Sequence, residues 1–151
     1  VIGGANSALS EALYLSNICR KVYLVYRSEK LRGENILIDR LLQKNNIEVI
    51  YNQNVKDYII ENDKIIGVKL EKKEILASCI FLAIGYLPNS EVINSKKENG
   101  YIIVDEHGMT NIPDVYACGD VIKKDLYQIV TSSSEGAIVA SNIIKRNSGR
   151  V

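Results

Sequence analysis

The sequence predicts an α/β fold in which helices cover a mainly parallel sheet. The chain opens with two β-formers, a Gly-rich turn and a helical pattern. Helical and strand patterns then alternate up to residue 51, as they do in βαβ units. A continuous apolar run at 79–85 has the composition of a strand that is buried on both faces of a parallel sheet.

Hydrophobic periodicity and turn residues place the first elements. An amphipathic helix is expected at 8–18, a buried strand at 21–26, a second helix at 31–44 and a further strand at 47–51. Three β-rich segments follow at 55–60, 64–71 and 74–77, separated by short breaks at Asn62-Asp63 and Lys72-Lys73. These breaks favour an antiparallel β-meander over another crossover helix. The run at 79–85 is expected to return to the parallel sheet and to place Gly85 at its carboxyl edge.

The stretch Tyr86-Leu87-Pro88-Asn89 is a breaker and the expected domain boundary. We therefore divide the chain into residues 1–87 and 88–151. In the second part, strands are expected at 100–105 and at 115–118, before Gly119-Asp120. A polar stretch at 131–134 leads into a last helix, whose apolar face holds Ala137, Ile138, Ala140 and Ile144.

Composition is that of a globular protein, with 46% hydrophobic and 25% charged residues in 151 positions. A net charge of +1 argues against a polybasic surface for nucleic acid or membrane, and no apolar run is long enough for a membrane span. Cys19, Cys79 and Cys118 are widely spaced and form no C-x-x-C, so neither a disulfide framework nor a metal site is expected. Scattered thiols of this kind suit a reducing cytoplasm.

The N-terminal turn has the context of a dinucleotide-binding loop. A strand, a Gly-rich turn and a helix allow the backbone to approach a pyrophosphate, which the helix N-terminus then attracts. Ala5 occupies the second key position of the G-x-G-x-x-G/A pattern. The alternative is a strand–helix turn without a ligand. Only two residues precede Gly3, fewer than a normal strand contains, so we expect the chain to start inside a central strand of a Rossmann-like sheet.

The end of the strand at 21–26 indicates the preferred cofactor. An acidic residue about 20 positions after the glycines would bind the ribose 2′-hydroxyl of NAD, but Tyr26 stands there and Arg27 follows it. Arg27 and Arg32, with Ser28 between them, are able to hold a 2′-phosphate by charge-assisted hydrogen bonds. NADP is therefore the predicted cofactor, and solvated surface arginines are the alternative.

Five motifs occur in order and in register: V-I-G-G-A-N-S-A-L-S-E-A-L-Y-L-S-N, V-Y-R-S-E-K-L-R, A-I-G-Y-L-P-N-S, G-Y-I-I-V-D and I-P-D-V-Y-A-C-G-D-V. Together they resemble the C-terminal half of bacterial thioredoxin reductase, over essentially the whole chain. The resemblance implies a flavoprotein that passes electrons from NADPH through FAD to a disulfide. It further implies thioredoxin or a similar small redox protein as partner, a homodimeric parent protein and a cytoplasmic location.

The resemblance also implies cofactor-binding roles. The pyrophosphate turn corresponds to Gly3, Gly4, Ala5, Asn6, Ser7 and Ala8, with Ala5 in place of a family glycine. Arg27 and Arg32 correspond to two of three arginines that bind the 2′-phosphate, and Ser28 replaces the third. Ile84 and Gly85 correspond to the segment along the nicotinamide half. The FAD motif corresponds to Gly119, Asp120 and Val121, and the pair beside the flavin ring to Gln128 and Ile129.

No catalytic residue is expected in this chain, because the family's C-x-x-C and first FAD turn lie upstream of the position of Val1. The predicted function is therefore that of a fragment of an NADPH-dependent thioredoxin-disulfide reductase. Two alternatives are a related ferredoxin–NADP reductase without the C-x-x-C and a non-catalytic nucleotide-binding module.

Overall fold

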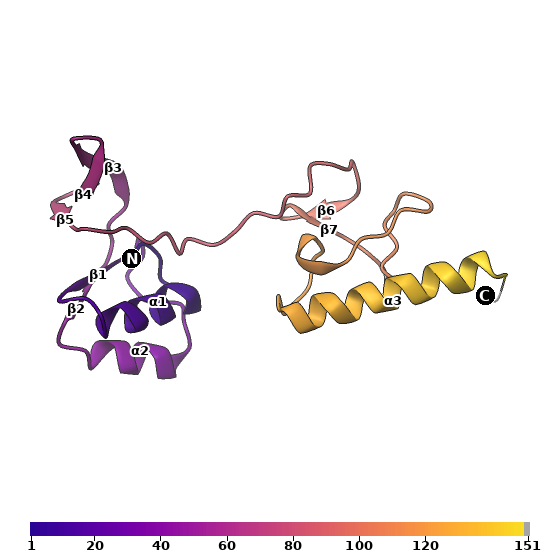
Figure 1. The fold of residues 1–151 in the computed structure, drawn as a ribbon, viewed down its shortest axis with the longest axis horizontal. Coiled ribbons are helices and arrows are strands. Elements are labelled where there is room, and N and C mark those ends of the chain that lie inside the picture. Colours follow the sequence, from indigo (N-terminus) through magenta and orange to yellow (C-terminus); the bar gives the residue numbers. More distant parts are fainter. Residues whose placement is uncertain (150–151) are drawn as a thin grey trace. The chain divides into compact units, whose positions relative to one another are not determined.

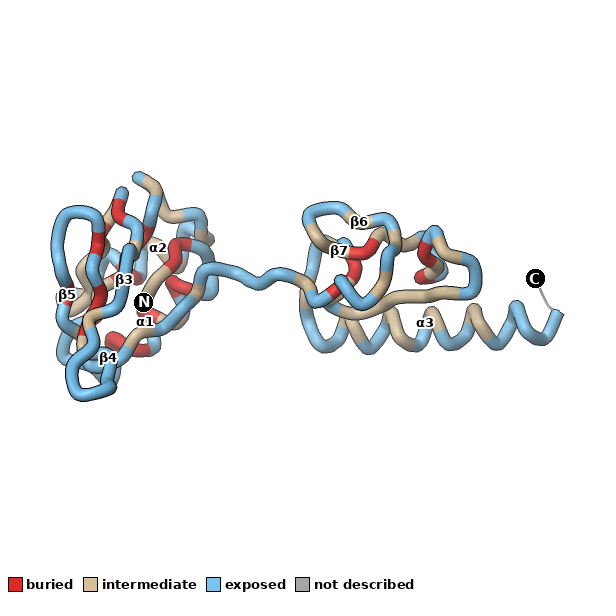
Figure 2. The backbone as a smooth tube through the Cα atoms, turned by 90° about the horizontal axis from the view of Figure 1, so that it is seen from above, coloured by how far each residue is buried: buried red, intermediate tan, exposed pale blue. Residues whose placement is uncertain are grey.

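The computed structural model describes residues 1–149, which form two compact units. The first unit is Val1–Gly85, and the second begins at Tyr86. The division lies two residues before the boundary expected after Leu87 and within the same exposed segment. Buried residues gather inside each unit (Figure 2).

The first unit has three layers (Figure 1). A parallel pair of strands, β1 and β2, is covered on one face by helices α1 and α2 and on the other by an antiparallel sheet with the order β3-β4-β5. The bounds are α1 Asn6–Ser16, β1 Val22–Val25, α2 Asn35–Leu42, β2 Ile47–Ile50, β3 Val55–Glu61, β4 Lys64–Leu70 and β5 Glu74–Leu76. The order of helices and strands that periodicity predicted for residues 8–77 is therefore confirmed.

Alternation along β1 separates the two cores of this unit. Val22 and Leu24 pack with the buried face of α1, whereas Val25 packs with buried residues of β2, β4 and β5. Successive side chains of a strand point to opposite faces, so one short strand serves both cores. Ala8 and Ala12 are fully buried one helical turn apart, which fixes the inner face of α1.

The β3–β4 hairpin closes on the two residues that the sequence indicated. Asn62 and Asp63 have φ values of 49° and 58°. Positive φ at both central positions is the geometry of a type I′ turn, which matches the twist of antiparallel strands. The predicted meander is confirmed by the antiparallel pairing of β3 with β4 and of β4 with β5.

Ile2 is the central element of the parallel layer. It forms parallel bridges to Val25 on one side and to Leu82 on the other. The strand predicted at 79–85 is nevertheless wrong, since only Leu82 is bridged and its side chain is 56% exposed. Within the described chain, this segment pairs with Ile2 alone. The carbonyl of Ile2 accepts from the amide of Ala83, and the amide of Ile2 donates to the carbonyl of Phe81, both at 2.8 Å. A β-strand extends only as far as a neighbouring strand forms backbone hydrogen bonds with it.

Helix α2 begins at Asn35, and the start predicted at residue 31 is wrong. The residues before it contact the N-terminal turn instead. The amide of Arg32 donates to the carbonyl of Gly4 at 2.7 Å, and the amide of Glu34 donates to Oδ1 of Asn6 at 2.7 Å. Because the amides of Arg32 and Glu34 are bonded to the N-terminal turn, residues 31–34 do not form the first turn of α2.

The second unit contains β6 (Lys97–Glu98), β7 (Tyr101–Ile102), the short 3₁₀ helix η1 (Gly119–Val121) and helix α3 (Ile129–Asn147). The strand expected at 100–105 is thus reduced to two residues. The strand expected at 115–118 is absent from the described residues apart from a single bridge between Tyr116 and Met109.

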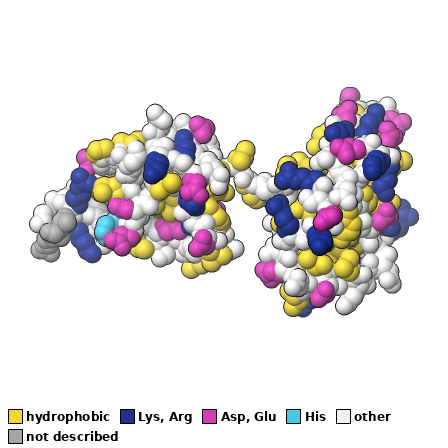
Figure 3. Space-filling model, turned by 180° about the vertical axis from the view of Figure 1, so that it is seen from behind, with side chains coloured by type: hydrophobic (Ala, Val, Ile, Leu, Met, Phe, Trp, Pro, Cys, Tyr) yellow, Lys and Arg dark blue, Asp and Glu magenta, His cyan; other side chains and the backbone are white. Residues whose placement is uncertain are grey.

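Helix α3 starts at Ile129, so the polar stretch at 131–134 lies within the helix and does not precede it. The Thr131 hydroxyl accepts from the amide of Gln128 at 3.2 Å and caps this end. Val139 packs close to Gly108, whose added Cβ would lie 2.3 Å from it. The apolar face predicted from periodicity is exposed: Ala137, Ile138, Ala140 and Ile144. Hydrophobic side chains are also visible at the surface of both units in Figure 3.

In the described part of the chain, none of the helices combines the length and apolar character that crossing a bilayer requires.

Candidate functional site

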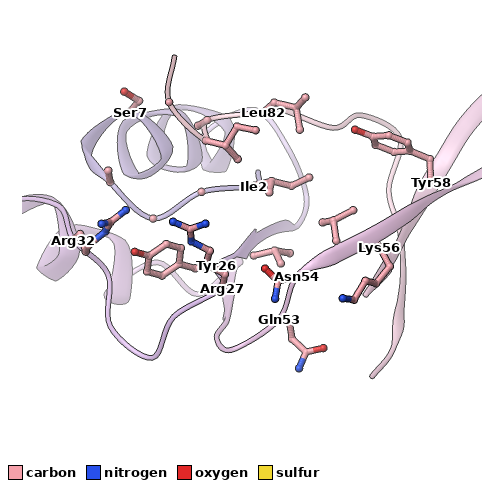
Figure 4. A pocket seen from close by; sticks show the side chains of 18 of the residues that line it. Ile2, Ser7, Tyr26, Arg27, Arg32, Gln53, Asn54, Lys56, Tyr58 and Leu82 are labelled. Atoms are coloured by element: carbon pink, nitrogen blue, oxygen red, sulfur yellow. The ribbon is translucent and has the colours of Figure 1, made fainter. Parts of the chain in front are cut away.

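A cavity of about 680 Å³ lies at the carboxyl edge of the parallel layer in the first unit. We call it the edge cavity (Figure 4). Its walls come from the N-terminal turn, the end of β1 with the following loop, the β2–β3 turn with the start of β3, and the segment after Phe81. They comprise Ile2, Gly3, Gly4, Ala5, Ser7, Val25, Tyr26, Arg27, Arg32, Gln53, Asn54, Val55, Lys56, Asp57, Tyr58, Leu82, Ala83, Ile84 and Gly85.

The two glycines of the N-terminal turn are required by close packing. Gly3 has a φ of 146°, and a Cβ there would lie 2.2 Å from the carbonyl oxygen of Ala83. A Cβ at Gly4 would lie 2.4 Å from the ring of Tyr26. Ala5, in contrast, has an extended backbone with φ −104°, which any residue adopts. The glycines therefore bring the chain against its neighbours, and the turn tolerates the methyl group of Ala5.

Helix α1 begins directly after this turn, with Ala5 as its N-cap. Among the described residues, no side chain caps this end, and its first turn contains no acidic residue. The first N–H groups of a helix have no intrahelical acceptor, and the helix dipole places partial positive charge there. Such an end is suited to an anionic group at the cavity wall.

Of the residues that the structure describes, three cations and one carboxylate line the edge cavity. Arg27 and Arg32 come from the loop after β1, Lys56 comes from β3, and the carboxylate belongs to Asp57. The lining therefore carries a net charge of +2, against +1 for the whole chain. Positive charge concentrated in a cleft of this kind attracts an anionic ligand.

A second, smaller site lies in the other unit. A cavity of about 480 Å³ is lined by Asp120, Tyr127, Gln128, Ile129, Ser132 and Ser133. Gly119 precedes it with φ 80°, a conformation that favours glycine. The carboxylate of Asp120 accepts from the Ser132 hydroxyl at 2.9 Å and remains largely exposed to the cavity. It is therefore free to accept further hydrogen bonds.

A polar network fixes the Gly119 turn from behind. Glu135 accepts from the Gly119 amide at 2.7 Å and from Nζ of Lys124 at 3.0 Å. The Lys124 side chain is only 10% exposed. Burial lowers the pKa of Lys124, but its hydrogen bonds to Glu135 and Asp120 outweigh burial and raise the pKa above its ordinary value. Lys124 therefore stays charged and holds both acidic side chains.

These two sites can be compared with known proteins. The sequence profile of the family described as pyridine nucleotide-disulphide oxidoreductase matches residues 1–136. The chain belongs to this family. Among its oxidoreductase relatives, the thioredoxin reductase of Buchnera aphidicola subsp. Schizaphis graminum (strain Sg) is 39% identical over 158 residues, covering 93% of this chain and 50% of the relative. The thioredoxin reductase of Bacillus subtilis (strain 168) is 34% identical over 152 residues, covering 95% and 48%.

Solved oxidoreductases agree with this assignment. The crystal structure of Lactococcus lactis thioredoxin reductase in its FR conformation superposes with a TM-score of 0.81 at 33% identity, covering 95% of this chain and 50% of that one. The thioredoxin reductase of T. acidophilum gives a TM-score of 0.81 at 28% identity, covering 97% and 51%. These matches confirm the Rossmann-like α/β fold, and the chain spans about half the length of these relatives.

The structure of this chain brings together most of the residues predicted for the first site. The edge cavity is lined by Gly3, Gly4, Ala5, Ser7, Arg27, Arg32, Ile84 and Gly85. Asn6, Ala8 and Ser28 lie outside its lining. The Asn6 side chain bonds with Glu34 in both directions, at 2.7 and 3.0 Å, and Ala8 is fully buried beneath Gly3.

At the second site, Asp120, Gln128 and Ile129 line the cavity, whereas Gly119 and Val121 lie outside its lining. Sequence reasoning did not find the wall formed by residues 53–58, because 55–60 was interpreted only as a strand of the meander and residues 53–54 were given no role. Their position directly after β2 was the available indication, since ligands of parallel sheets bind beyond the carboxyl ends of the strands.

Proposed function

We propose that this oxidoreductase chain carries the NADPH-binding unit and part of the FAD-binding unit of a thioredoxin reductase. The observation that carries the proposal is the edge cavity, because the Gly3-Gly4 turn, the N-terminus of α1 and two arginines all line it. The similarity to thioredoxin reductases of about twice the length supports the same function.

The residues of the edge cavity fit NADPH. The uncapped N-terminus of α1 suits the pyrophosphate, and Gly3 and Gly4 line the cavity with backbone alone. Arg27 and Arg32 are the groups we assign to the 2′-phosphate. Ile84 and Gly85 would lie along the nicotinamide half, where Gly85 has no heavy atom within 4 Å of an added Cβ.

The residues of the second site fit part of an FAD site. Asp120 presents an exposed carboxylate held by Ser132 and Lys124, which suits hydroxyl groups of a ribityl chain. Gln128 and Ile129 would lie near the flavin ring, since Ile129 presents an 86% exposed apolar side chain at the same cavity. When both cofactors are bound, they supply hydride transfer from nicotinamide to flavin and electron transfer to a disulfide.

The partner that we propose for the whole enzyme is thioredoxin or a similar small redox protein, and the whole enzyme is proposed to be a homodimer in the cytoplasm. The names of the relatives support thioredoxin as the partner, and three free cysteines suit a reducing cytoplasm.

Nucleotide binding by the chain itself is the first test. The isotope-labelled 151-residue protein is titrated with NADPH and with NADH, and backbone amide shifts are followed by NMR, which detects weak binding. We expect NADPH to shift the amides of Gly3, Gly4 and Ser7 and to bind more tightly than NADH. Unchanged amide positions in the N-terminal turn at millimolar NADPH would contradict the proposed site.

A further inference from the structure

Lys56 lines the edge cavity from β3, whereas Arg27 and Arg32 line it from the loop after β1 (Figure 4). Its Nζ lies 3.0 Å from Oε1 of Glu71, which follows β4. The same carboxylate oxygen accepts from Nδ2 of Asn54 at 3.2 Å, and Asn54 also lines the cavity. One acidic residue thus holds two polar side chains of this wall.

The turn that carries this wall is attached to the arginine loop by backbone hydrogen bonds. The amide of Gln53 donates to the carbonyl of Tyr26 at 3.3 Å, and the amide of Asn52 donates to the carbonyl of Ser28 at 3.4 Å. The Gln53 side chain is 7% exposed and accepts from the amide of Lys72 at 3.1 Å. The position of Lys56 relative to the loop that contains Arg27 is therefore set by the fold.

We propose that Lys56 is a third nucleotide-binding cation, which contacts the negative charge that NADPH and NADH share, and that Glu71 competes with the ligand for it. The inference rests on the proposed nucleotide site. Arg27 and Arg32 already account for the 2′-phosphate, and the diphosphate is the remaining anionic group of both nucleotides. Lysine binds phosphate as a point charge without a fixed geometry.

The ion pair with Glu71 is of the kind that a ligand can replace. The Lys56 side chain is 60% exposed and that of Glu71 is 35% exposed. An exposed pair of this type contributes little to stability, so a phosphate is able to displace the carboxylate. The pKa of Glu71 is lowered, first by its hydrogen bond to Lys56 and then by that to Asn54, so the carboxylate is charged at neutral pH and competes with the ligand.

Two variants of the same ion pair give opposite expected results. Lys56→Gln weakens NADP⁺ and NAD⁺ binding alike, by about three- to fivefold, as expected for one exposed charge contact. Glu71→Gln tightens both, by about twofold, because it removes the competing carboxylate. Matched controls are Lys69→Gln and Glu74→Gln, an exposed pair at 3.9 Å on β4 and β5 outside the lining of the edge cavity. Both controls leave binding unchanged in amide-shift titrations.

The outcomes separate this inference from the proposed function. A wild-type chain that binds neither nucleotide overturns both. Suppose that the wild-type chain binds both nucleotides. An unchanged affinity in Lys56→Gln, or a loss of affinity in both Lys56→Gln and Glu71→Gln, then shows that the pair only stabilises the β3–β4 hairpin, and it overturns this inference alone. A loss confined to NADP⁺ also overturns it, because Lys56 would then contact the 2′-phosphate.

Discussion

Replacing Arg27 by Ala tests the proposed 2′-phosphate contact directly. Arg27 lines the edge cavity and is exposed, so its removal leaves no buried group unpaired. A hydrogen bond to a charged group contributes about 1.5–3 kcal/mol, and exposure places this contact at the lower end. We therefore expect a loss of about 1.5 kcal/mol for NADPH, which corresponds to a factor of about 10 in Kd.

The assay for Arg27→Ala compares NADPH with NADH, because NADH lacks the 2′-phosphate. Affinity for NADH should change by less than a factor of about 2 if the contact is confined to that group. Arg40→Ala is the control, since Arg40 is an exposed arginine on α2 outside the cavity lining. An equal loss for both nucleotides, or no loss for either, would refute the assignment of Arg27 to the 2′-phosphate.

Further predictions concern the turn, the second site and the chain as a whole. The backbone at Ala5 does not require glycine, but its methyl group lies on the cavity wall, so Ala5→Gly should tighten NADPH binding if the gain exceeds a flexibility cost of about 0.5–1 kcal/mol; weaker binding would show that the methyl group does not crowd the ligand. Gly4→Ala should lower the free energy of unfolding by about 1–3 kcal/mol, because its Cβ would collide with the buried ring of Tyr26, and an unchanged denaturation midpoint would contradict this. Glu135→Ala should destabilise the second unit by about 1–3 kcal/mol by leaving Lys124 without its main partner, measured by hydrogen exchange in η1 and α3. The purified 151-residue chain should show no flavin absorbance, because it carries only part of the proposed FAD site, around Asp120 and Gln128, and no NADPH-dependent disulfide reduction, because its sequence contains no C-x-x-C.

Elements with their own local pattern were predictable from the sequence. Helix α1 and strand β1 carry dense apolar periodicity, and the β3–β4 hairpin carries Asn62-Asp63, two residues that accept positive φ at low cost. In these segments the local preference and the tertiary environment agree, so the pattern alone locates the element.

Elements that depend on a neighbour were predicted less well. The run at 79–85 is apolar enough for a strand, but only Leu82 forms a bridge in the described structure, and its partner is Ile2. The start of α2 is displaced by hydrogen bonds from Arg32 and Glu34 to the N-terminal turn. The apolar face of α3 follows helical periodicity correctly, yet the described structure places another helix face against the unit. Periodicity indicates which residues share a face, and it does not show what covers that face.

Backbone hydrogen bonds assemble the walls of the edge cavity. The amide of Gly3 donates to the carbonyl of Val25 at 3.0 Å, that of Arg32 to Gly4 at 2.7 Å, and that of Gln53 to Tyr26 at 3.3 Å. These bonds join the Gly-rich turn, the arginine loop and the β2–β3 turn without using a lining side chain. Substitutions of exposed lining side chains should therefore change ligand affinity while the fold persists, whereas a side chain added at a glycine of the turn should lower the stability of the fold.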